Sequence, residues 1–116
     1  MTIKDCYEMA GSDYGKVVER LGSEALVKRF ALKFLTDGSY EKLKDAMERG
    51  HGEDAFHGAH TLKGVCLNLG FDALGAVSSE LTESMRENRD TAKGEIYMER
   101  ISAEYNKLIE LLKQVQ

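Results

Sequence analysis

The 116-residue chain has no proline and no tryptophan, and it has only two cysteines. Because proline interrupts helices, its absence together with plentiful Leu, Glu, Lys, Ala and Met favours long helices over strands and turns. Cys6 and Cys66 have neither a metal-binding nor a redox spacing, so we expect both to remain reduced. The composition therefore predicts an all-α protein.

The chain also lacks a strong charge of one sign and any long apolar run. Its formal charge is −4, with acidic and basic residues interspersed, so no basic stripe is present to follow a nucleic-acid backbone. No apolar segment approaches the roughly 20 residues of a membrane span, and the first residues carry acids. We therefore expect a cytoplasmic protein that binds neither nucleic acid nor membrane, folded as one domain over residues 1–116.

Apolar residues recur at helical spacing between short break signals throughout the chain. The spacing predicts helices over residues 2–10, 14–21, 24–36, 40–49, 53–69, 72–88 and 92–115. Ser39 is expected to cap the fourth of these, and Gly70 to end the fifth. Helices with one apolar side need a partner, so we expect an antiparallel up-and-down four-helix bundle preceded by a short N-terminal lead-in helix.

The helix predicted at residues 53–69 carries opposite chemistry on its two sides. At about 100° per residue, its apolar side chains gather within roughly 120° of the helix circumference. These core-facing residues are Ala55, Ala59, Leu62, Val65, Cys66 and Leu69. His60 falls about 150° from the centre of this stripe, so we expect its side chain to point into solvent.

The neighbours of His60 on this exposed side are unusual. Gly64 lies one turn on, and a glycine within a helix costs up to about 1 kcal/mol relative to alanine. The missing side chain would leave bare backbone open to another protein. Lys63 adds a flexible ammonium group suited to phosphate oxygens, and an uncharged imidazole offers a nucleophilic nitrogen near neutral pH. The combination predicts a phosphorylatable histidine.

With the run Ala59-His60-Thr61-Leu62-Lys63-Gly64, followed by Asn68-Leu69-Gly70 and by Leu74 and Leu81, the sequence resembles the histidine-containing phosphotransfer (HPt) domain. The likeness is sharpest over residues 59–81. The rest of the chain fits through its helix pattern.

The resemblance implies that His60 is phosphorylated, on Nε2, by the aspartyl phosphate of a receiver domain and passes the group to another receiver. Lys63 would neutralise phosphoryl charge, and Gly64 would leave room for the receiver. The implied partners are response-regulator receiver domains and a hybrid sensor histidine kinase. Mg²⁺ is expected on the receiver during transfer, and no cofactor on this chain, which we expect to be monomeric.

The resemblance also points to residues around this centre. A Gln or Glu on the following helix often steadies the histidine ring in this family, but the corresponding position here is Thr82, whose shorter hydroxyl would reach through water or not at all. Leu67 and Phe71 would form the apolar centre of a docking surface, with Asn68 and His57 beside it. His57 either tunes His60 electrostatically or is a solvated bystander.

Two other readings remain open on the sequence alone. Asp54 and His57, or His57 and His60, have the i, i+3 spacing that presents two metal ligands on one side of a helix. A bundle-core metal site would nevertheless point its ligands inward. A helical adaptor that docks without transferring phosphate is the third possibility. The chain has no Gly-rich phosphate loop or kinase-like residue set, so we expect no ATP-dependent kinase activity of its own.

Overall fold

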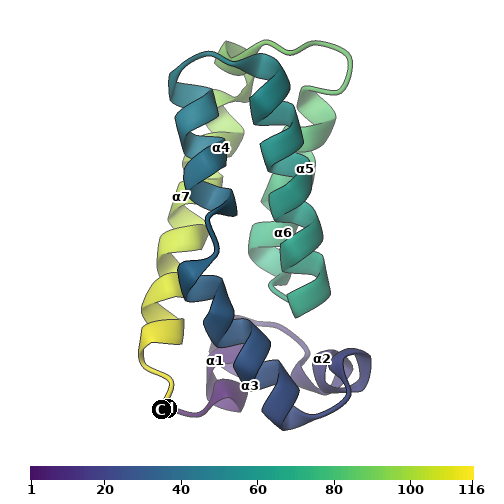
Figure 1. Cartoon of the computed structure of the whole chain (residues 1–116), viewed down its shortest axis with the longest axis vertical. Coiled ribbons are helices and arrows are strands. Elements are labelled where there is room, and N and C mark those ends of the chain that lie inside the picture. The colour runs from purple at the N-terminus through teal and green to yellow at the C-terminus, as the bar shows by residue number, and fades with distance from the viewer.

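The structure is a computed structural model that describes residues 1–116. It contains only helices and connections, which confirms the all-helical class (Figure 1). The elements are α1 (Ile3–Met9), α2 (Tyr14–Leu21), α3 (Glu24–Lys33), the 3₁₀ turn η1 (Phe34–Thr36), α4 (Ser39–Glu48), α5 (Gly52–Leu69), α6 (Asp72–Ser84) and α7 (Thr91–Lys113). None of these helices combines the length and apolar character that a bilayer span requires.

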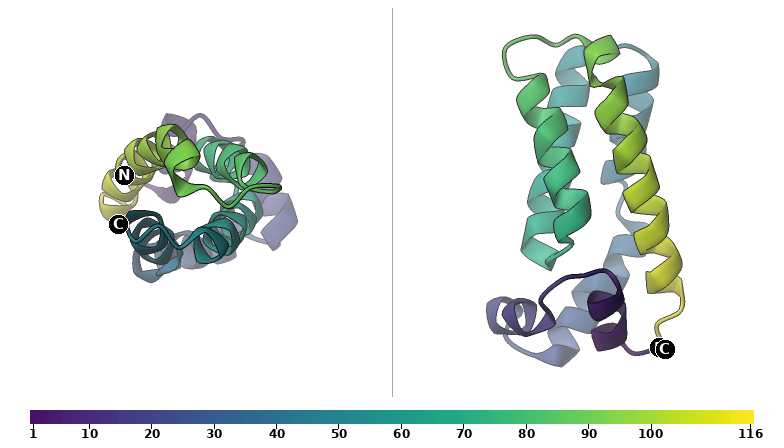
Figure 2. Two further views of the ribbon diagram at one scale, coloured as in Figure 1. Left: turned by 90° about the horizontal axis from the view of Figure 1, so that it is seen from above. Right: turned by 180° about the vertical axis from the view of Figure 1, so that it is seen from behind.

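The four helices α4 to α7 lie side by side along the longest axis of the molecule, which measures 40 × 23 × 20 Å (Figure 1). Each packs against two others: α4 against α5 and α7, and α6 against α5 and α7. Seen from above, they surround a common centre (Figure 2). Their apolar sides fill that centre, where Leu43, Leu62, Leu81 and Ile101 are fully buried.

Side chains cap the starts of α1, α2, α3 and α7 but not those of α4, α5 and α6. Asp13 caps α2, since its carboxylate accepts a hydrogen bond of 3.2 Å from the Lys16 amide. Ser39 was expected to cap α4 but is instead its first residue. The Asp37 carboxylate accepts a hydrogen bond of 2.8 Å from the Ser39 amide, and so satisfies a donor that the helix itself leaves unpaired.

Two predicted helix boundaries are wrong. The helix expected over residues 24–36 changes into the 3₁₀ turn η1 at Phe34. The helix expected to reach residue 88 ends at Ser84. There the Met85 amide donates to the carbonyls of Leu81 and Thr82 in the last turn, and the Arg89 guanidinium donates to the carbonyls of Met85 and Arg86 just after the helix.

The N-terminal helices close one end of the molecule against the turn between α5 and α6. Gly70 forms this turn with a φ of 75°, in the left-handed region that favours glycine. A Cβ at Gly70 would lie 2.2 Å from Cγ2 of Val17, so α2 packs directly on the turn. The two chain termini also meet at this end, where the Gln116 amide donates to the Met1 carbonyl at 3.1 Å (Figure 1).

Candidate functional site

His60 lies near the middle of α5 with its side chain exposed. The opposite side of the helix is the core-facing stripe expected from the sequence: Ala55, Ala59, Leu62, Cys66 and Leu69 are buried, and Val65 is half-buried. The predicted orientation of this helix is therefore confirmed, and it leaves the His60 imidazole accessible to another molecule.

The two helical glycines near His60 have different surroundings. A Cβ added at Gly64 would meet no atom within 4 Å, so the surface one turn after His60 is open. A Cβ at Gly58 would lie 3.3 Å from the Leu43 Cα, because α4 and α5 approach closely there. Gly58 therefore serves helix packing, whereas no packing contact within the molecule requires a glycine at Gly64.

Leu67 lies two turns after His60 and is 45% exposed, which is unusual for a large apolar side chain in this molecule. A Cβ at Gly75 would lie 3.1 Å from the Leu67 Cδ2 atom. This contact fixes how α5 lies against α6. Leu67 thus offers apolar surface on the same side of α5 as His60, as expected.

Asn68 is exposed at the end of α5, and its carbonyl accepts a hydrogen bond of 3.2 Å from Arg20 of α2. The same guanidinium donates to the Leu67 carbonyl. These are two of the carbonyls that the end of a helix leaves without a partner. No pattern along the chain indicated this contact, since 47 and 48 residues separate the partners.

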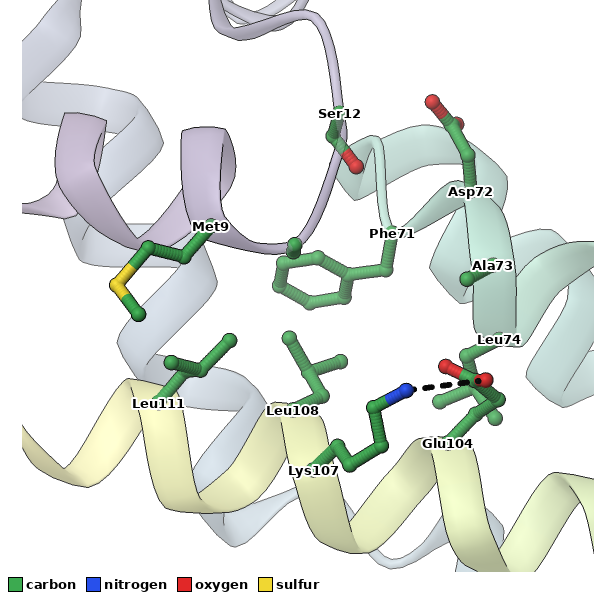
Figure 3. Close-up of a pocket in the computed structure, with 11 residues that line it drawn as sticks. Met9, Ser12, Phe71, Asp72, Ala73, Leu74, Glu104, Lys107, Leu108 and Leu111 are labelled. Carbon is green, nitrogen blue, oxygen red and sulfur yellow. Dashed lines mark ion pairs between the residues drawn. The ribbon is translucent and has the colours of Figure 1, made fainter.

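Phe71 does not contribute to an exposed apolar centre, so that expectation is wrong. It is 3% exposed, and its ring stacks on Tyr7 with 5.6 Å between ring centroids. Figure 3 shows the ring facing Leu108 and Leu111 of α7 across a small pocket of about 100 Å³. Packing against α1 and α7 therefore withdraws this side chain from the surface.

Thr82 does not orient His60 through its hydroxyl. The residue is fully buried, and its hydroxyl donates a hydrogen bond of 2.8 Å to the Ser78 carbonyl one turn earlier in α6. Such back-bonding to the preceding turn is a common arrangement for a helical threonine. The hydroxyl is satisfied inside α6, while the imidazole is exposed on α5.

An ion pair between Glu83 of α6 and Arg86, just after that helix, was not singled out from the sequence. Glu83 accepts hydrogen bonds of 3.0 and 2.8 Å from the Arg86 guanidinium. These bonds, with the positive charges of Arg86 and Lys63, lower the pKa of the Glu83 carboxyl. Lys63 itself is half-buried. The only signal in the sequence was the i, i+3 spacing of Glu83 and Arg86.

His57 belongs to a polar cluster one turn before His60. Its Nε2 atom lies 3.5 Å from a Glu53 carboxylate oxygen, and the other oxygen of that carboxylate lies 2.9 Å from Arg89 Nε. The Arg89 guanidinium lies 3.8 Å from the centre of the Phe56 ring. All of His57, Glu53 and Phe56 are on α5, so this cluster ties the start of the helix to the loop after α6.

The structure brings together no group of three or more His, Cys, Asp or Glu side chains able to hold a metal ion. Cys66 is fully buried in the core, where burial raises the pKa of its thiol to about 12. The metal-binding reading gains no support from this arrangement.

Comparison with known protein families defines the class of the chain. A family model of the Hpt domain matches residues 36–116. The chain therefore belongs to the Hpt domain family, whose members are phosphocarrier modules of two-component phosphorelays rather than kinases. The match includes α4 to α7 with His60, Lys63 and Gly64, whereas α1 to α3 lie outside it. No curated protein and no solved structure matches the chain.

Proposed function

We propose that this protein carries a phosphoryl group on His60, accepting it from the aspartate of one receiver domain and passing it to another. Membership of the Hpt family supports histidine phosphotransfer in a phosphorelay. The observation that supports His60 as the carrier is its exposure on α5 beside the open surface at Gly64. Of the three histidines, it is the one with Lys63 one turn on.

The transfer requires an accessible nucleophile and positive charge near the phosphoryl oxygens. The lone pair of His60 Nε2 attacks phosphorus, the new N–P bond forms, and the P–O bond to the receiver aspartate breaks with its electron pair returning to the carboxylate. The Nδ1 proton stays on the ring. Lys63 is proposed to attract the phosphoryl oxygens, and Mg²⁺ is proposed to be held by the receiver. The carrier needs no ATP in this scheme.

We further propose that α4 to α7 form an antiparallel up-and-down four-helix bundle whose exposed α5 side is the docking surface. Leu67 supplies its apolar centre, with Gly64 leaving room for the receiver and Asn68 and His57 at its edges. We expect one domain over residues 1–116 that acts as a cytoplasmic monomer between a hybrid sensor histidine kinase and response regulators.

The test is to incubate the protein with a phosphorylated receiver domain and follow phosphate that is acid-labile and base-stable. His60→Gln is expected to abolish labelling. His57→Gln is the matched control, because His57 is also an exposed histidine on α5, and it is expected to keep most of the labelling. Equal labelling of His60→Gln and the parent protein would show that His60 is not the carrier. Receiver binding without any labelling of the parent protein would instead indicate a passive adaptor.

A further inference from the structure

The Glu83 carboxylate interacts with two cations. It accepts two hydrogen bonds from the Arg86 guanidinium, at 3.0 and 2.8 Å. The positive charge of Lys63 also helps to lower the pKa of this carboxyl. Both Glu83 and Arg86 are exposed. The phosphoryl group on His60 would therefore enter a set of charges that already includes one carboxylate.

The position of this carboxylate follows from the packing of α5 on α6. The contact of Leu67 with Gly75 fixes one point of the pairing. The Arg86 guanidinium lies 5.7 Å from the centre of the Phe56 ring and fixes a second. His60 lies between Leu67 and Phe56 on α5, so it lies alongside the segment between Gly75 and Arg86, which includes Glu83.

We propose that Glu83 competes with the phosphoryl group of His60 for Lys63, and that Arg86 limits this competition by holding the Glu83 carboxylate. This inference rests on the proposed function of His60. Lys63 cannot pair fully with both anions, because its single ammonium charge is shared between them. A bidentate guanidinium is a stronger partner for a carboxylate than an ammonium group, so Arg86 leaves Lys63 largely available.

The competition would set how readily the carrier accepts and keeps its phosphoryl group. Neutralising Glu83 frees Lys63 and removes a negative charge from the neighbourhood of the phosphoryl oxygens. Removing Arg86 has the opposite effect, since the released carboxylate turns to Lys63. One turn earlier on α5, the Glu53 carboxylate pairs with Arg89 at 2.9 Å and lies 3.5 Å from His57 Nε2. Interactions between exposed charges are weak, so changes of about two- to five-fold are expected.

The experiment measures the rate of phosphoryl uptake from a phosphorylated receiver and the phosphorylated fraction at equilibrium. Glu83→Gln is expected to raise both about two- to five-fold, and Arg86→Gln to lower both by a similar factor. In the Glu83→Gln background, Arg86→Gln should have no further effect, because Arg86 acts only through Glu83. The effect of Glu83→Gln should shrink as salt is added.

The matched controls are Glu80→Gln and Arg100→Gln, which break a similar exposed pair of 2.9 Å between α6 and α7. They should leave both quantities unchanged, and the unfolding midpoint should hardly move in any of these variants. Slower uptake by Glu83→Gln would overturn the proposal, since it would mean that the carboxylate assists His60 directly. A further loss from Arg86→Gln in the Glu83→Gln background would also contradict it. Failure of the proposed function is distinguishable, because the parent protein would then take up no phosphate on His60.

Discussion

The Tyr7 hydroxyl donates a hydrogen bond of 2.6 Å to the carbonyl of Leu69, the last residue of α5. The bond is buried and links residues 62 positions apart. It anchors α1, which lies outside the Hpt match, to the helix that carries His60. The N-terminal helices therefore help to hold in place the helix that carries the proposed site.

Tyr7→Phe tests this support. The substitution leaves the Leu69 carbonyl buried without its side-chain partner, so we expect a loss of about 1–3 kcal/mol in the free energy of unfolding. Urea unfolding followed by circular dichroism measures it. Tyr97→Phe is the control, since Tyr97 is half-buried and its hydroxyl makes no hydrogen bond within the chain. Equal effects of the two substitutions would show that the Tyr7 bond contributes nothing specific.

Alanine at two glycines of α5 should have opposite effects on stability. A Cβ at Gly64 meets open space, so Gly64→Ala should stabilise the helix by about 0.5–1 kcal/mol. A Cβ at Gly52 would lie 2.0 Å from the Arg89 backbone carbonyl oxygen, so Gly52→Ala should destabilise by about 1–3 kcal/mol. Thermal unfolding of both variants measures these changes in stability. A loss of stability in Gly64→Ala would argue against an open surface at Gly64.

A larger side chain at Gly64 addresses docking rather than folding. Gly64→Leu should keep the helical signal and should not lower the melting temperature. It should nevertheless weaken binding of a receiver domain by at least about ten-fold, because the added side chain fills the space that the receiver needs. Titration by calorimetry measures the change. Unaltered affinity would count against docking over this glycine.

Lys63→Ala should slow phosphoryl uptake while changing the free energy of unfolding by less than about 0.5 kcal/mol. The physical reason is that Lys63 would interact with the phosphoryl group mainly during transfer. Lys93→Ala, at an exposed lysine of α7, is the control and should affect neither quantity. A large fall in stability for Lys63→Ala would mean that the lysine is mainly structural.

Alkaline pH should destabilise the fold through Cys66. Burial raises the pKa of its thiol from 9.0 to about 12. This contribution to stability is therefore complete below about pH 9 and is lost as pH rises toward 12. Unfolding free energies measured under reducing conditions at pH 8 and pH 10 should differ by about 1 kcal/mol less in Cys66→Ala than in the parent protein. An identical pH dependence would contradict the burial of this thiol.

The orientation of α5 could be predicted because it depends on local periodicity. The spacing of Ala55, Ala59, Leu62 and Cys66 places one side of the helix in the core and leaves His60 outside. The positions of the other helices followed from similar spacing and from break signals such as Gly70. Their final turns were less predictable: α6 ends at Ser84, and the residues after it are held by the Arg89 side chain, which donates to the carbonyls of Met85 and Arg86.

The burial of Phe71 and the hydrogen bond of Thr82 could not be predicted from local sequence patterns. Phe71 follows a turn glycine, and only the packing of α1 and α7 around it decides that it is buried. Thr82 was expected from the resemblance to replace a longer polar side chain beside His60, but its hydroxyl is used within α6. The contacts of Arg20 and Tyr7 with the end of α5 are likewise long-range. No spacing along the chain encodes them.

The meeting of the first and last residues makes the molecule suitable for circular permutation. The Met1 ammonium donates to the Gln114 carbonyl at 3.2 Å and the Gln116 amide donates to the Met1 carbonyl at 3.1 Å, so a short glycine-rich linker could join the ends. New ends would be opened outside the connection between α6 and α7, because Arg89 in that connection contacts Glu53 and Phe56 of α5.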